Sequence, residues 1–124
     1  MGILGSVLAV KQAKKVSGAF NQAFREQYGT YPPLAATEAV QSATAIILSF
    51  SGTGREKLGA ERLSACIDDY CKQFPGDEDK IAAGLICIAS ICMTSRGTVA
   101  FGYTWAADVV AAAILMRCPS YTPF

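Results

Sequence analysis

The sequence predicts an all-α fold, a compact single-domain bundle of about five helices in which the two C-terminal apolar helices are central. Five segments carry apolar residues at the three- and four-residue spacing of a helix. Short turn signals rich in glycine and proline separate these segments. The 124 residues match one domain, which we expect to span 1–124, with 1–4 as a flexible or acylated N-terminus and 118–124 as a C-terminal tail.

The first expected helix, residues 5–28, is the most sharply two-faced segment of the chain. Its apolar side carries six residues at helical spacing: Ala13, Val16, Phe20, Ala23, Phe24 and Tyr28. At about 100° per residue, the basic residues fall together on the opposite side: Lys11, Lys14, Lys15 and Arg25. This pattern is typical of a surface helix with a solvated basic face, and it also fits a membrane-facing helix.

The second and third expected helices are bounded by proline and glycine. The second covers residues 34–50, begins after Pro33 and closes at Gly52. The third covers residues 55–74 and ends at Pro75-Gly76, only a few residues before the next helix. So short a link predicts antiparallel neighbours. Cys66 and Cys87 are nearly equidistant from that turn, so we expect their thiols to lie close together.

The fourth and fifth expected helices are almost free of charge. The fourth begins with the acidic residues 77–79 and is uncharged over residues 81–95, and the fifth covers 98–117 with Asp108 as its one carboxylate. Helices that are apolar all round are buried, so we expect this pair at the centre. A membrane hairpin is the alternative, although a span needs about 20 apolar residues and a central carboxylate is costly there. We expect Asp108 to reach a cation such as Arg96, or else solvent or a partner.

Composition argues against several functional classes. The net charge of +1 provides no basic field for nucleic acid, and the chain contains no histidine, the usual general base near neutral pH. The five cysteines are odd in number and sit mostly in apolar helical patterns, which is typical of reduced thiols in the cytosol. Their C-x4-C spacing does not suit zinc. We therefore expect no enzymatic activity, no cofactor and no bound metal.

The opening residues MGILGS match the Met-Gly-x-x-x-Ser pattern of N-myristoylation, with Gly2 as the acceptor. A single acyl chain holds a protein only marginally on a membrane, and the basic face could supply the second attraction. An unmodified terminus is the alternative. This layout, an acylation signal followed by a basic helix and a helical bundle, is similar to that of retroviral matrix domains. Residues 31–34 (YPPL) also resemble the short YPxL motif of some viral proteins, although ordinary turn chemistry accounts for them.

These observations favour a non-enzymatic structural or interaction protein that self-assembles or docks a protein partner. We expect it to be cytoplasmic. If Gly2 is acylated, the acyl group and the basic face would together hold it peripherally on an anionic membrane surface. Two alternatives remain open. One is a soluble helical binding module of the inhibitor or immunity type, and the other is a membrane subunit that inserts residues 81–95 and 98–117 as a hairpin.

Overall fold

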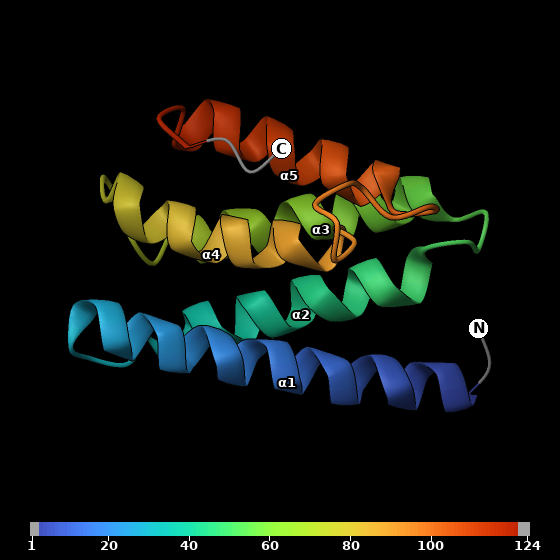
Figure 1. Ribbon diagram of the computed structural model, residues 1–124, viewed down its shortest axis with the longest axis horizontal. Coiled ribbons are helices and arrows are strands. Elements are labelled where there is room, and N and C mark those ends of the chain that lie inside the picture. The colour runs from blue at the N-terminus through green and yellow to red at the C-terminus, as the bar shows by residue number, and fades with distance from the viewer. Residues whose placement is uncertain (1–2, 122–124) are drawn as a thin grey trace.

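The computed structural model describes the backbone from residue 3 to residue 121 and the side chains from residue 7 to residue 121. Five helices make up this part of the chain: α1 (Ile3–Tyr28), α2 (Leu34–Phe50), α3 (Glu56–Cys71), α4 (Glu78–Ile91) and α5 (Thr104–Arg117). The predicted all-α bundle is confirmed (Figure 1).

The helices lie roughly side by side, with α1 along one edge of the bundle and α5 along the opposite edge (Figure 1). The helix α4 contacts all four others, whereas α5 packs mainly on α3 and α4. The central position expected for both C-terminal helices therefore applies to α4 but not to α5. The pattern of α5 was misleading because alanines count as apolar yet add little buried area, and its outer side leaves Leu115 and Met116 exposed.

The junction between α4 and α5 differs most from the expected boundaries. Residues 92–103 form a tight hairpin instead of helix, with an isolated antiparallel bridge between Met93 and Val99. The Thr94 amide donates to the Thr98 carbonyl at 2.7 Å, and their two hydroxyl oxygens lie 2.9 Å apart. Gly97 has a φ of 81°, which suits glycine in the turn. A break at Arg96 and Gly97 was expected, but helix was expected to reach it from both sides, because the hydropathy of residues 92–95 and 98–103 does not mark a hairpin closed by threonines.

The core includes a cluster of four aromatic rings from α1, from α3 and from the turn that follows α3. Phe20 and Phe24 of α1 pack against Tyr70 and Phe74. The centroids of neighbouring rings among these four residues lie 5.3 to 5.8 Å apart. Tyr70 is fully buried, and its hydroxyl donates to the Lys80 carbonyl at 2.6 Å. The burial of these rings holds α1, α3 and the start of α4 together.

The expected antiparallel course of α3 and α4 is visible in Figure 1. The expected pairing of Cys66 with Cys87 is wrong, because the two thiols line different depressions. Cys66 lines one between α2 and α3, and Cys87 lines one between α1 and α4. The helix α3 packs mainly on α2 and α5, so equal distance from the turn does not bring these faces together. Asp108 is exposed, which is one of the outcomes expected for it.

Candidate functional site

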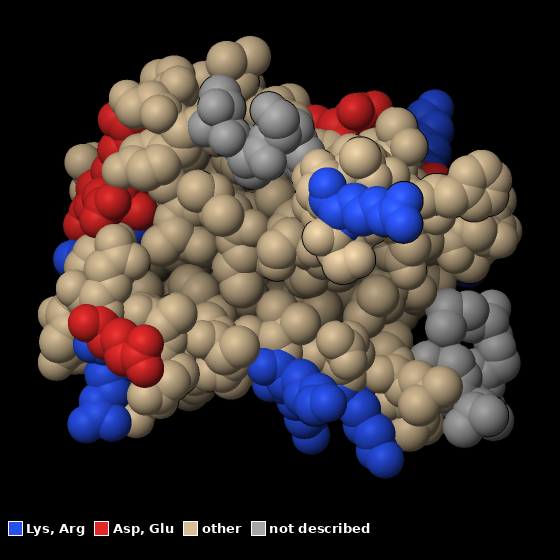
Figure 2. All heavy atoms as spheres, in the orientation of Figure 1, with Lys and Arg blue, Asp and Glu red and all other residues tan. Residues whose placement is uncertain are grey.

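The four predicted basic residues are all exposed on α1. Lys11, Lys14, Lys15 and Arg25 point away from the side of α1 that packs on α2, where Ala13 is buried. Figure 2 shows basic side chains gathered along the lower edge of the molecule, over α1. The predicted acylation site Gly2 lies outside the described residues.

Arg25 is separated from the three lysines by both distance and contacts. It lies ten residues beyond Lys15 on α1, and its Nη1 donates to the hydroxyl of Tyr31 at 2.9 Å. Its guanidinium also lies 4.9 Å from the centroid of the Tyr31 ring, a cation–π geometry. Arg25 is therefore held against the α1–α2 loop, and the predicted basic set divides into a lysine cluster and a separate arginine.

Three aliphatic side chains beside the lysine cluster are exposed, a feature that the sequence reasoning missed. Val7 is 46% exposed, Leu8 57% and Val10 47%. With Lys11, Lys14 and Lys15 they occupy one side of the helix, within an arc of about 160° at 100° per residue. We call these six residues the amino-terminal face of α1. The apolar run at residues 7–10, before the lysines, was the available signal.

These aliphatic residues are exposed because they lie on the side of α1 opposite Ala9 and Ala13, which are buried. The two helices pack antiparallel: Ser17 donates to the Gln41 side chain at 3.2 Å and Thr37 donates to Asn21 at 2.5 Å. In this register the last residue of α2, Phe50, is level with Leu8. The helix α1 begins at Ile3, so only its residues before Leu8 extend beyond α2, and residues 8–15 lie alongside α2.

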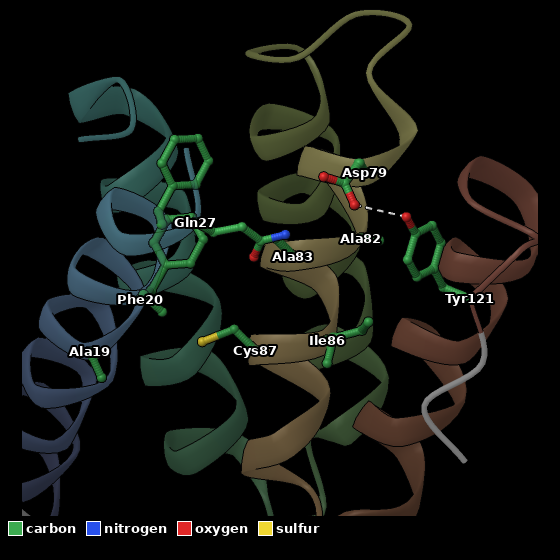
Figure 3. A pocket seen from close by; sticks show the side chains of 11 residues that line it. Ala19, Phe20, Gln27, Asp79, Ala82, Ala83, Ile86, Cys87 and Tyr121 are labelled. Carbon is green, nitrogen blue, oxygen red and sulfur yellow. Dashed lines mark hydrogen bonds between the residues drawn. The ribbon is translucent and has the colours of Figure 1, made fainter. Parts of the chain in front are cut away.

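A pocket of about 460 Å³ lies between α1 and α4 (Figure 3). Its walls are mostly alanine, phenylalanine and isoleucine side chains, with polar groups at one end. The lining residues are Ala19, Phe20, Ala23, Phe24, Gln27, Asp79, Ala82, Ala83, Ile86, Cys87 and Tyr121. The pocket is open because α1 and α4 touch only lightly. Its size and apolar walls fall within the range of ligand-binding and side-chain-binding pockets.

Asp79 provides the charge at the polar end of this pocket. Its carboxylate accepts hydrogen bonds from Tyr28 at 2.6 Å and from Tyr121 at 2.8 Å, and Figure 3 shows the second. These two bonds lower the pKa of Asp79, so the group is ionised at neutral pH. Sequence reasoning treated Asp79 as an acid at a helix start and missed this role, because the two tyrosines are distant in the sequence.

The thiol in the pocket does not provide a nucleophile. Cys87 projects from α4 toward α1 (Figure 3), and burial raises its pKa to about 11. It is therefore protonated at neutral pH, whereas thiol nucleophiles react as thiolates. The pKa of Tyr28 is also raised, first by burial and then by its bond to Asp79. The pocket thus combines an apolar lining, neutral hydroxyls and one negative charge, a combination suited to binding.

Comparison of the chain with protein-family models, with curated proteins and with solved structures finds no match. Among the helices of the described residues, none has the length and apolar character needed to cross a bilayer. The helices α4 and α5 have 14 residues each, below the minimum of about 17 for a span. Within the described part of the chain, no three His, Cys, Asp or Glu side chains gather in a way that could hold a metal ion.

Proposed function

We propose that this protein is a non-enzymatic interaction protein that docks peripherally on an anionic membrane surface through the amino-terminal face of α1. One observation carries the proposal: three exposed aliphatic side chains adjoin three exposed lysines on the side of α1 that faces away from α2. Helices that lie in a membrane interface have this composition, with apolar groups entering the headgroup boundary and lysines meeting anionic lipid.

The expected strength of this contact is modest. Each lysine near an anionic surface contributes about 1 kcal/mol, so the cluster contributes about 3 kcal/mol. Burying the exposed parts of Val7, Leu8 and Val10 adds roughly 1 kcal/mol each, about half the value for a fully exposed side chain. A total near 6 kcal/mol corresponds to a dissociation constant of about 0.04 mM, before the cost of immobilising the protein is subtracted. Binding is therefore reversible and falls with salt.

Acylation at Gly2 would strengthen attachment at the same end of the molecule. Gly2 lies five residues before Val7 in the chain. A myristoyl group binds membranes with an association constant of about 10⁴ M⁻¹ and needs a second attraction, which the amino-terminal face would supply. Intact mass of protein made in a host with N-myristoyltransferase tests this component: loss of Met1 and gain of one myristoyl group is expected. An unmodified mass would remove acylation from the proposal.

Sedimentation with lipid vesicles tests the surface itself, with unacylated protein. We expect binding to vesicles of mixed phosphatidylserine and phosphatidylcholine, little binding to phosphatidylcholine alone, and release by high salt. Lys14→Glu with Lys15→Glu is expected to weaken binding at least tenfold, because two attractions become repulsions. The matched control is Lys57→Glu with Lys72→Glu, two exposed lysines outside α1 with the same change in net charge. Equal binding by the two double variants would overturn the proposal.

A further inference from the structure

We infer that the pocket between α1 and α4 receives the amino-terminal face of α1 from a second copy of this chain, so that molecules join head to tail. This inference goes beyond membrane docking, because it assigns an occupant to the pocket and a second use to the same face of α1. Three properties carry it: matching apolar surfaces, complementary charge, and a placement that rules out contact within one molecule.

The apolar surfaces of the two sites correspond in kind and in size. The pocket offers small and aromatic side chains as walls, and Ile86 at its rim is 39% exposed. Its 460 Å³ equals the volume of about fifteen liquid waters, enough to admit a few aliphatic side chains. Val7, Leu8 and Val10 are aliphatic, exposed, and carried on the outer side of α1, at one edge of the bundle (Figure 1). Docking would remove both apolar surfaces from water.

The charges of the two sites are opposite. The two hydroxyl groups bonded to Asp79 stabilise its negative charge without neutralising it. Among residues 7–121 the ion pairs are Lys80–Asp77 and Arg117–Asp68, so none of them involves Asp79. An incoming lysine of the amino-terminal face, such as Lys11 or Lys14, would meet this carboxylate at the rim while the aliphatic side chains enter the pocket. Such a contact sets orientation and weakens with salt.

The placement of the two surfaces makes the contact intermolecular. The pocket uses α1 around Ala23, whereas the amino-terminal face is centred near Lys11 on the same helix. Twelve residues at roughly 1.5 Å of rise each separate them by about 18 Å, so a molecule cannot fill its own pocket in this way. Because the two surfaces differ, the contact is heterologous. Such contacts form rings or open chains and leave one free site of each kind at every open end.

Complementation between two defective variants tests this arrangement. Ile86→Glu places a charge in the pocket, and Leu8→Glu places one on the amino-terminal face. We expect wild-type protein to show concentration-dependent growth in sedimentation velocity up to about 1 mM, and each variant to remain monomeric. An equal mixture of the two should form a 1:1 dimer, since one partner retains a pocket and the other retains a face. This recovery also shows that both variants are folded.

Leu115→Glu alters another exposed leucine, on α5, and is expected to assemble like wild type. The inference would be overturned if wild-type protein were monomeric or if the mixture of variants formed no dimer. It would also be overturned if Leu115→Glu lost assembly, or if deletion of residues 122–124 abolished it. Vesicle binding separates it from the proposed function: Ile86→Glu should bind vesicles normally, so either idea can fail without the other.

Discussion

The ring of Tyr70 on α3 lies against Gly84 on α4, in the space that a side chain at residue 84 would occupy. A Cβ atom built on Gly84 would lie 2.0 Å from Cζ of Tyr70 and 2.4 Å from its hydroxyl oxygen. The same hydroxyl donates to the Lys80 carbonyl one turn earlier in α4. The absence of a side chain at Gly84 therefore lets a buried aromatic ring bind the backbone of the neighbouring helix.

Gly84→Ala is expected to destabilise the fold by about 3 kcal/mol, because a buried ring must move or leave its hydrogen bond. Gly18→Ala is the matched control: Gly18 is helical and exposed, with nothing within 4 Å of an added Cβ. That change should stabilise the protein by roughly 0.5–1 kcal/mol through helix propensity. Urea unfolding followed by the fluorescence of Trp105, the one tryptophan, measures both. Equal stability of the two variants would contradict the packing described.

Trp105 connects α5 to the end of α2 through a hydrogen bond. Its Nε1 donates to Oγ of Ser51 at 3.1 Å. Trp105→Phe and Ser51→Ala should each cost about 1 kcal/mol, and the double variant should cost less than their sum because both remove the same bond. Circular dichroism during urea unfolding measures all three variants, since the fluorescent residue is itself changed. Strict additivity would show that the bond contributes nothing to stability.

The hydrogen bonds from Tyr28 and Tyr121 to Asp79 predict that the free energy of unfolding changes with pH in both acidic and alkaline solution. Folding lowers the pKa of Asp79. The carboxylate therefore contributes to the stability of the fold at pH values above its unfolded pKa, near 3.9, and this contribution is lost as the pH falls through its folded pKa. Folding raises the pKa of Tyr28, so its contribution is present below about 10 and is lost as the pH rises further.

NMR titration of the carboxyl carbons measures the pKa of Asp79 and so tests the prediction for acidic solution. In Tyr28→Phe and in Tyr121→Phe the pKa of Asp79 should rise toward its ordinary value, since each variant removes one hydroxyl donor. Tyr31→Phe is the control, because that hydroxyl bonds to Arg25 instead. An unchanged pKa of Asp79 in both test variants would mean that the tyrosines do not hold the carboxylate.

The sequence was sufficient for features that repeat along a single helix. Apolar spacing predicted all five helices, and the same projection placed the lysines on the outer side of α1, where they lie. Such features depend only on the 3.6-residue period of a helix, which can be recognised within the sequence of each helix by itself. The start of α2 after Pro33 followed in the same way from the local chemistry of proline.

Features that depend on pairing between helices could not be predicted. The pocket follows from the light contact between α1 and α4. The bonds from Tyr28 and Tyr121 to Asp79 join positions 51 and 42 residues apart. No local pattern specifies these relationships. The failed pairing of Cys66 with Cys87 has the same cause, since spacing from a turn does not determine which faces meet.

The depth of Leu8 at a lipid surface tests the proposed docking most directly. Leu8→Trp in a Trp105→Phe background places the one tryptophan on the amino-terminal face of α1, and Leu115→Trp in the same background is the control on α5. With anionic vesicles containing lipids brominated on their acyl chains, we expect a blue shift and strong quenching at position 8, and neither effect at position 115. Bound protein with an unquenched tryptophan at position 8, or stronger quenching at position 115, would contradict docking through α1.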